Sequence, residues 1–248
     1  MRVIWIMWWR QLIRQWRAKG RLVGALGQPL LFLLAFGFGF GPVFARAGQG
    51  SYLQFIAPGV ISMGVIFSAM FSGIELIWDR QFGFIKETLV APVPRWQIML
   101  GRACGGASVA LLQASLVALV SIAVGFRAAS TAHVLLALVF AALVALMFTA
   151  LGTAIASVVE DFQAFPLVMN FLVMPLFFLS GALFPLDGVP AALAAIARFN
   201  PVAYAVDGVR GALTGAWHFA PVLDLGVLAA MTVLALGVGT ALFTRIEA

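Results

Sequence analysis

Long, continuous apolar stretches dominate this sequence of 248 residues. The hydrocarbon core of a bilayer requires roughly 20 consecutive apolar residues for each spanning helix. Membrane-spanning strands are excluded, because the apolar residues do not alternate with polar ones. The pattern therefore predicts an all-α integral membrane protein with a single transmembrane domain over residues 1–248. The six expected transmembrane helices cover about residues 22–41, 55–78, 103–125, 134–157, 165–184 and 221–243.

The composition narrows the class of protein further. Hydrophobic residues make up 63% of the chain and charged residues only 10%. A soluble domain carries about 25% charged residues, because its whole surface faces water. A soluble enzyme and a nucleic-acid-binding protein are therefore excluded. We expect the lipid bilayer, and no nucleic acid, among the partners.

Lysine and arginine are distributed unevenly over the predicted loops. If the N-terminus is cytoplasmic, eleven of these residues lie on the cytoplasmic side and four on the other. Basic residues accumulate in the cytoplasmic loops of membrane proteins. We therefore expect a multi-pass protein of the bacterial cytoplasmic (inner) membrane, with both termini in the cytoplasm.

Residues 1–21 precede the first predicted span and are amphipathic. One helical face carries Arg10, Arg14, Arg17 and Arg21. The opposite face carries Trp5, Trp9, Leu12 and Trp16. This pattern is typical of a helix that lies in the membrane interface. The alternative, a cleaved signal peptide, fits less well because its apolar segment is usually about 7–15 residues long.

The loops differ in length and character. The predicted cytoplasmic segment 79–102 is long and charged, whereas the cytoplasmic loop 158–164 is short. Residues 185–220 are too polar to span the membrane and too apolar for a free loop. They divide at Asn200-Pro201 into two short helical pieces, about 189–199 and 202–214. Because irregular backbone at membrane depth must be covered by protein or line a water-filled space, we expect a short outer helical hairpin that acts as a lid.

No catalytic or metal site is indicated. A P-loop needs Gly-Lys-Ser/Thr, but Lys19 is followed by Gly20 and Lys86 by Glu87. A rhomboid-type serine site at Ser180-Gly181 fails because position 178 is Phe. A single cysteine and two separate histidines favour no metal centre. We expect no cofactor on this chain.

Few polar residues lie within the predicted spans. Glu75 is either a residue of the transport pathway or a carboxylate at the cytoplasmic end of a span, paired with Arg80 or another basic group. Asn170, between Pro166 and Pro175, is a polar residue within the fifth span. A role in helix packing explains its presence as well as a role in transport does.

Two sequence segments together resemble the permease subunit of type-2 ABC exporters, the branch that exports drugs, lipids and polysaccharides. The first runs from Asp79-Arg80-Gln81-Phe82-Gly83 through residues 87–95 to Gly101-Arg102, and departs from the family at Gln81, where an acidic residue is commoner. The second comprises residues 178–186, Pro190 and the segment 200–210, which begins Asn-Pro-Val-Ala-Tyr. The resemblance extends over nearly the whole chain.

The resemblance implies that two six-span subunits pair and bind two separate ATPase subunits, which supply the P-loop, ATP and Mg²⁺. Segment 79–102 would then be a coupling helix that docks on the ATPase. The implied coupling residues are Asp79, Arg80, Lys86, Glu87, Pro92 and Arg95, with Glu160 and Asp161 as a second contact. The candidates for the pathway or lid are Glu75, Asn170, Ser180, Tyr204, Asp207 and Arg210. Asp207 and Arg210, three residues apart on a helix, are expected to pair.

The expected function is ATP-driven export of a hydrophobic, lipid-linked or polysaccharide substrate. A self-contained secondary transporter or channel is the alternative, although such proteins more often carry several ionisable groups in mid-span. A membrane enzyme is the third possibility, and it lacks a catalytic constellation. The apolar, aromatic walls favour a hydrophobic or lipid-linked cargo over a small ion.

Overall fold

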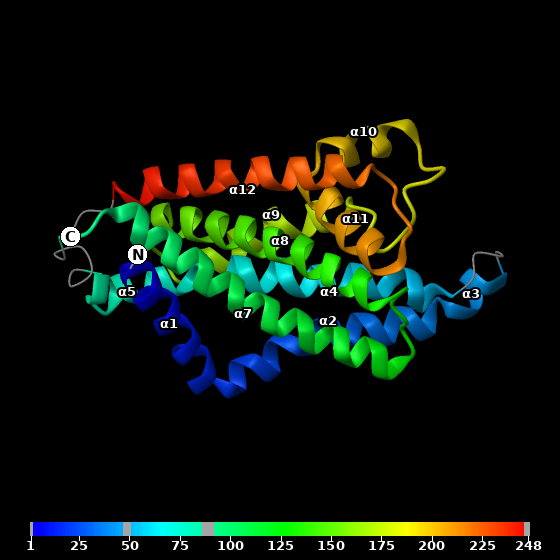
Figure 1. Cartoon of the computed structure of the whole chain (residues 1–248), viewed down its shortest axis with the longest axis horizontal. Coiled ribbons are helices and arrows are strands. Elements are labelled where there is room, and N and C mark those ends of the chain that lie inside the picture. Colours follow the sequence, from blue (N-terminus) through cyan, green and yellow to red (C-terminus); the bar gives the residue numbers. More distant parts are fainter. Residues whose placement is uncertain (1, 47–50, 86–91, 246–248) are drawn as a thin grey trace.

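The computed structural model describes residues 2–46, 51–85 and 92–245, and these residues form a bundle of long helices without a strand. Most helices run along the long axis of the bundle (Figure 1). Helix α1 and the end of α12 lie at one end of the bundle, and α3, α10 and α11 lie at the other. The helices are α1 Arg2–Arg17, α2 Lys19–Gly39, α3 Gly41–Arg46, α4 Tyr52–Phe71, α5 Ile74–Gln81, α7 Arg95–Val124, α8 Thr131–Val158, α9 Ala164–Phe178, α10 Ala191–Phe199, α11 Pro201–Thr214 and α12 Pro221–Phe243.

Among the residues that the structure describes, four helical segments are long and apolar enough to cross a membrane. They are Tyr52–Gln81, which joins α4 and α5, together with α7, α8 and α12. The first predicted span corresponds to Leu26–Gly39, the apolar part of α2, and the fifth corresponds to α9, Ala164–Phe178. Both of these apolar segments are shorter. The protein is therefore an all-helical, multi-pass membrane protein. Six spans remain the prediction of the sequence.

Local sequence signals define several helix ends. The side chain of Ser130 accepts a hydrogen bond from the backbone N–H of His133 at the start of α8. Asn200 caps α11 in the same way through Val202, and Pro201 occupies the first turn. Gly215 ends α11 with a φ of 78°, a left-handed conformation that glycine adopts without steric cost. The two hairpin helices α10 and α11 thus divide at Asn200-Pro201.

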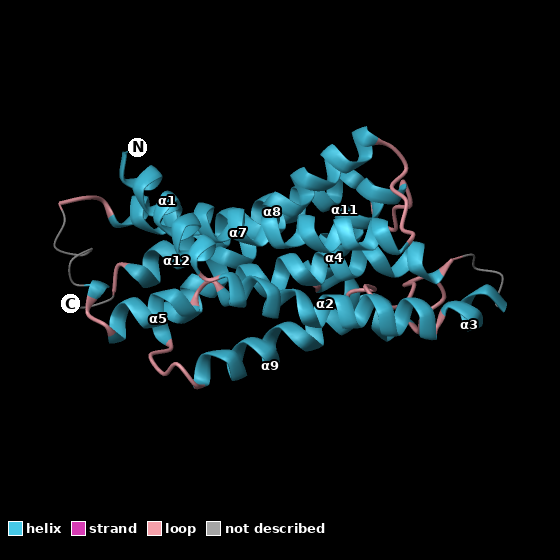
Figure 2. Ribbon diagram, turned by 90° about the horizontal axis from the view of Figure 1, so that it is seen from below, coloured by secondary structure: helices cyan, strands magenta, loops and turns pink. Residues whose placement is uncertain are grey.

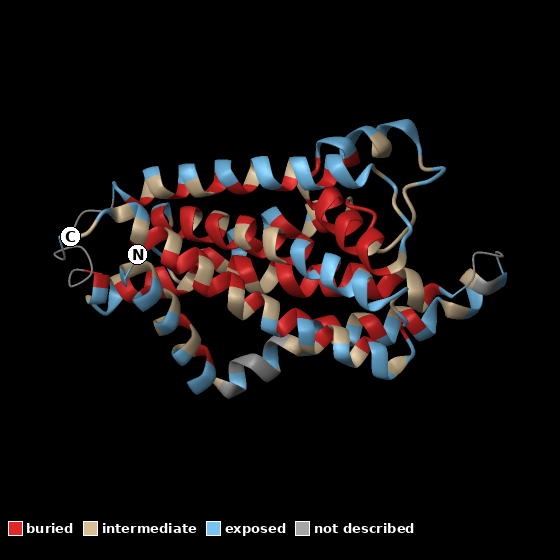
Figure 3. Ribbon diagram, viewed as in Figure 1, coloured by how far each residue is buried: buried red, intermediate tan, exposed pale blue. Residues whose placement is uncertain are grey.

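The core of the bundle is built around α4, which packs against α2, α7, α8 and α11. Buried residues concentrate along α4, α8 and α11, whereas the outer face of α12 is exposed (Figure 3). Helices α4 and α8 approach closely at Gly152, where an added Cβ would collide with the carbonyl oxygen of Met70. Glycine is therefore required here for the two backbones to touch.

Helix α9 lies at the edge of the bundle (Figure 2). Its outward side chains are large and apolar, and Phe171 is 86% exposed. In a membrane protein such a surface faces lipid or another membrane helix, because exposed apolar groups are costly only in water.

The charged segment expected at 79–102 is helical at both of its ends. Residues 79–81 belong to α5, and residues 95–102 form the first turns of α7, which begins after Pro94. The connection between these helices is residues 82–94. Lys86 and Glu87, two of the expected coupling residues, lie outside the described residues.

Candidate functional site

An ionic cluster joins three helices at one end of the bundle. The carboxylate of Asp79 on α5 accepts hydrogen bonds from Arg10 Nη2 at 2.7 Å and Arg14 Nη2 at 3.1 Å, both on α1. It also accepts one from Arg102 on α7. Asp79 is only 2% exposed and Arg102 only 4%. Buried charges of this kind are tolerated because they are paired and hydrogen-bonded.

Asp79 was expected to dock on a partner ATPase, and its surroundings argue against that role. The arginines enclose its side chain, so it is not available at the surface. We therefore reassign Asp79 to the cluster that joins α1, α5 and α7.

Glu75 is buried one turn before Asp79. Its Oε2 accepts a hydrogen bond from Arg14 Nη1 at 3.4 Å. The pairing with a basic group that the sequence suggested is therefore present, but Arg14 supplies it. Arg80 instead donates to the backbone oxygen of Ala156 at 3.5 Å.

Helix α1 packs along α7 and turns two of its arginines toward the protein. Arg10 and Arg14, which belong to the predicted arginine face, bind the carboxylates of α5. Arg17 is exposed, as are Trp5, Trp9 and Trp16. Trp8 points inward and donates to Ser108 Oγ at 2.9 Å.

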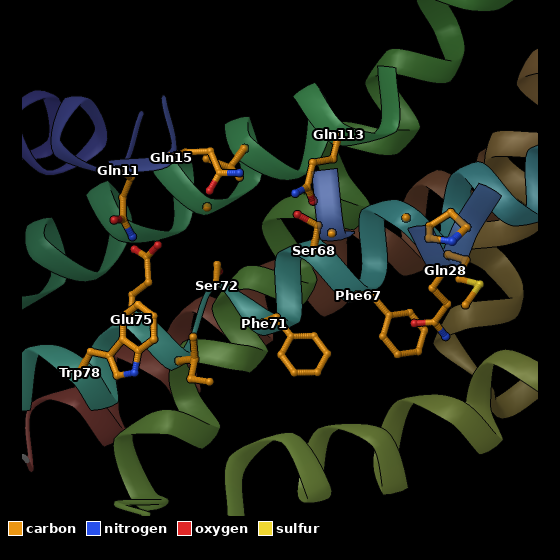
Figure 4. A pocket seen from close by; sticks show the side chains of 17 residues that line it. Gln11, Gln15, Gln28, Phe67, Ser68, Phe71, Ser72, Glu75, Trp78 and Gln113 are labelled. Atoms are coloured by element: carbon orange, nitrogen blue, oxygen red, sulfur yellow. The ribbon is translucent and has the colours of Figure 1, made fainter. Parts of the chain in front are cut away.

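A cavity of about 480 Å³ lies beside this cluster, between α1, α2, α4, α5 and α7 (Figure 4). Its polar lining consists of Gln11, Gln15, Gln28, Ser68, Ser72, Glu75 and Gln113. Its aromatic lining consists of Phe67, Phe71 and Trp78. Gln11 and Glu75 point toward one another at one end of the cavity. The space combines apolar walls with a few polar groups, which is typical of sites that bind small molecules.

The four glutamines of this cavity were missed by the sequence reasoning. Gln113 lies within an expected span, and polar residues inside spans are candidates for function. The sequence pattern drew attention there only to Glu75, Asn170 and Ser180. Gln11 and Gln15 are spaced four apart, so they share one face of α1. The opposed arginine and tryptophan faces are the more conspicuous pattern in this segment, so the spacing of the two glutamines was not interpreted.

A second, shallow groove lies at the surface where α5 ends. Gln81 and Phe82 line it together with Asp161 and Phe162, which precede α9. Trp78 also lines this groove, and its ring stacks on that of Phe162 with centroids 5.6 Å apart. The two loops expected to contact the ATPase therefore meet at this groove.

The other expected coupling residues are near the same end. Glu160, Asp161 and Pro92 are exposed. Arg95 Nη1 donates to the backbone oxygen of Thr244 at 2.6 Å, which ties the start of α7 to the end of α12.

Arg210 helps to fasten the outer hairpin to the bundle, where α11 also packs against α4, α8 and α12. Its guanidinium donates to the backbone oxygens of Gly181 at 2.9 Å and Ala182 at 3.2 Å, and lies 4.1 Å from the centre of the Phe55 ring. Burial lowers the pKa of Arg210 to about 10, so the group remains charged at neutral pH.

The expected hydrogen-bonded ion pair between Asp207 and Arg210 is not formed. Asp207 instead accepts from the backbone N–H groups of His218 and Phe219. The spacing of three residues permits a pair. In the structure, however, Asp207 binds backbone N–H groups of one neighbouring loop and Arg210 binds backbone oxygens of another.

The remaining lid and pathway candidates do not line the cavity. Ser180 Oγ donates to the backbone oxygen of Phe177, and Tyr204 Oη donates to that of Arg198. Both bonds are local and structural. Asn170 is exposed on α9. Of the six candidates, only Glu75 lies in the cavity wall.

Comparison with known proteins identifies the family of this chain. The family described as ABC-2 type transporter matches residues 2–214. Nodulation protein J of Rhizobium leguminosarum bv. trifolii is 30% identical over 249 residues, covering 97% of this chain and 93% of the relative. A ycf38 protein of Porphyra purpurea, named as a transport permease, is 31% identical over 217 residues, covering 85% of this chain and 74% of the relative. The chain therefore belongs to the ABC-2 type transporter family, whose members are the membrane subunits of ABC transporters.

Proposed function

We propose that this permease is half of an ATP-driven exporter, in which two copies pair and move a substrate outward through the glutamine-lined cavity. One observation carries the proposal: Trp78 lines both the cavity and the surface groove. A partner that presses on the groove would displace the same side chain that forms the cavity wall. Energy supplied outside the membrane would reach the pathway by this short route.

The partner at the groove is an ATPase subunit, which brings the P-loop together with ATP and Mg²⁺. Membership of the ABC-2 family supports such a partner. The groove combines the exposed ring of Phe82 with the carboxylate of Asp161. Aromatic residues at the centre of a contact and charges at its rim are typical of protein interfaces.

The cavity favours a substrate with both apolar and hydroxyl-bearing parts. Side-chain amides donate and accept hydrogen bonds without carrying charge, and Gln113 and Gln28 supply them on two different helices. The rings of Phe67 and Phe71 provide the apolar wall. A lipid-linked or polysaccharide substrate matches this lining better than a small inorganic ion.

A second copy would cover part of the exposed apolar surface. Helix α9 presents Leu167 and Phe171 outward, and a membrane helix with such a face packs against lipid or protein. In the proposed assembly both termini are cytoplasmic, and the bilayer is the bacterial cytoplasmic (inner) membrane. The outer hairpin then lies on the side away from the ATPase.

Reconstitution with its cognate ATPase tests the proposal. The full-length permease should co-purify with that ATPase, and substrate export should require ATP hydrolysis in proteoliposomes. Charge reversal by Asp161→Lys should weaken the association. Asp187→Lys is the matched control, because Asp187 is exposed near the opposite end of the bundle.

Two outcomes would contradict the proposal. Association with the ATPase that is unaffected by Asp161→Lys would remove the groove from the coupling site. Transport that is driven by an ion gradient without any ATPase would instead identify a self-contained secondary transporter.

A further inference from the structure

Two buried carboxyl groups face each other where the outer hairpin meets the last span. Asp207 lies on α11 and is 3% exposed, and Asp224 lies in the first turn of α12 and is 0% exposed. Helices α11 and α12 pack together at the end of the bundle opposite α1 (Figure 1). Neither the proposed pathway nor the coupling groove includes this pair.

Asp207 is held as a hydrogen-bond acceptor. The backbone N–H of His218 donates to its Oδ1 at 2.9 Å and its Oδ2 at 3.1 Å, and that of Phe219 donates to its Oδ2 at 2.7 Å. The loop before α12 therefore orients both oxygens of Asp207 as hydrogen-bond acceptors.

Asp224 has no comparable donors. Within the described part of the chain, neither of its oxygens receives a hydrogen bond from an N–H or O–H group. Its carboxyl group faces that of Asp207. Two ionised carboxylates can only accept, so they repel each other and leave buried acceptors unsatisfied. A proton between them converts the same contact into a strong hydrogen bond.

The nearby guanidinium of Arg210 does not remove the need for a proton between the two carboxyl groups. Arg210 attracts Asp207, but its guanidinium donates to Gly181 and Ala182 and lies over Phe55. No third acidic, histidine or cysteine side chain joins the pair in the described ranges to complete a metal site. The other titratable groups on the neighbouring elements are Tyr52 on α4, Arg127 before α8, His133 on α8, Arg198 on α10, Tyr204 on α11, and Asp187 and His218 in the loops.

We propose that Asp207 and Asp224 form a proton-binding site that holds one proton at neutral pH. In this site Asp224 is the acid and donates its O–H to the carboxylate of Asp207. The proton thereby fastens the first turn of α12 to α11, and so to the hairpin that Arg210 ties to α4 and the end of α9. This site goes beyond the proposed function, because it needs neither substrate nor ATPase.

The site has a defined effect on stability. An aspartate of the unfolded chain loses its proton near pH 4, whereas the native pair retains one. Between about pH 4 and the pH at which the native pair loses its proton, the native state binds one proton more than the unfolded state. The folding equilibrium constant then falls about tenfold per pH unit as the pH rises, until the native pair releases its proton. Above that pH the hydrogen bond between α11 and α12 is lost, and only their packing and the bonds of the loop to Asp207 remain.

Infrared spectroscopy of the purified full-length permease tests the proposal directly. The wild type at neutral pH should show the C=O stretch of a protonated carboxyl group. Asp224→Asn should abolish this band and keep the fold, because the amide also donates to Asp207. The matched control, Asp187→Asn, removes an exposed carboxyl group and should leave the band unchanged. A missing wild-type band, or a band that survives in Asp224→Asn, would overturn the proposal.

The pH dependence of thermal unfolding gives a second readout that requires only the wild type. The midpoint should fall as the pH is raised while the infrared band is present, and should level off where the band disappears. If Asp224→Asn folds, it should lack this part of the slope. A wild-type midpoint that does not fall with rising pH while the band is present would refute the fastening role. If Na⁺ or Ca²⁺ raises the midpoint and the protonated band is absent, the pair binds a metal cation and the proton assignment is wrong.

Discussion

Arg102 on α7 donates a hydrogen bond to the carboxylate of Asp79 on α5, and both side chains are almost completely buried. Arg10 and Arg14 approach the same carboxylate from α1. A single carboxylate therefore holds three guanidinium groups on two helices. Removal of that carboxylate would leave mutually repelling cations in a site with little access to water.

We therefore expect Asp79→Asn to destabilise the protein by about 3–5 kcal/mol, the usual cost of breaking a buried ion pair by removing one partner. Thermal unfolding of the full chain in detergent measures the effect. Asp161→Asn makes the same chemical change at an exposed position and should leave stability nearly unchanged. Equal unfolding temperatures for the two variants would show that the cluster does not stabilise the fold.

The close approach of α4 and α8 gives a second prediction. Gly152→Ala should cost about 1–3 kcal/mol, because the added Cβ collides with the backbone of Met70 and forces the helices apart. Gly237→Ala in α12 is the matched control, because an added Cβ there meets no atom within 4 Å. The control should be neutral or slightly stabilising, since alanine favours helix over glycine. A Gly152→Ala protein as stable as the control would contradict the close contact.

Filling the cavity should block export without unfolding the protein. Ser68→Trp places a large ring in the space between α4 and α7, and substrate export should fall at least tenfold. Ser115→Trp is the matched control on the exposed face of α7 and should export normally. Association with the ATPase is measured in both variants and should be retained. Normal export by Ser68→Trp would exclude this cavity from the pathway.

The attachment of the hairpin depends on Arg210. Arg210→Ala removes two charge-assisted hydrogen bonds to carbonyl oxygens, and each such bond is worth about 1.5–3 kcal/mol. We expect the segment 181–200 to become more accessible to protease. Arg198→Ala, at an exposed position on α10, should leave the cleavage rate unchanged. Identical rates in the two variants would show that other contacts hold the hairpin.

The sequence predicted the helices well, because each arises from a local pattern. Continuous apolar runs specify helices in a membrane, and Asn200-Pro201 specifies the break between α10 and α11 through a cap and a proline. The apolar run of the fifth predicted span, residues 165–184, is long enough to cross the bilayer, but helix α9 ends at Phe178. The number of spans therefore stays a prediction.

The partners of the polar side chains could not be predicted in the same way. Asp79 binds residues 69, 65 and 23 positions away in the sequence, and periodicity indicates only the face of a helix, not its neighbour. The expected ion pair between Asp207 and Arg210 does not form, for a related reason. Spacing along one helix said nothing about loop amides that compete for the same carboxylate. The glutamine lining of the cavity likewise emerges only when α1, α2 and α7 are brought together.

The contact at Gly152 also limits which parts of the permease can rearrange during a transport cycle. Backbones that touch without intervening side chains have no room to slide, so α4 and α8 should travel as one rigid body. Helix α9 is joined to its surroundings far more lightly. We therefore expect alternation between inward and outward states to take place by displacement of α9 against this fixed pair, and not by changes within the pair itself.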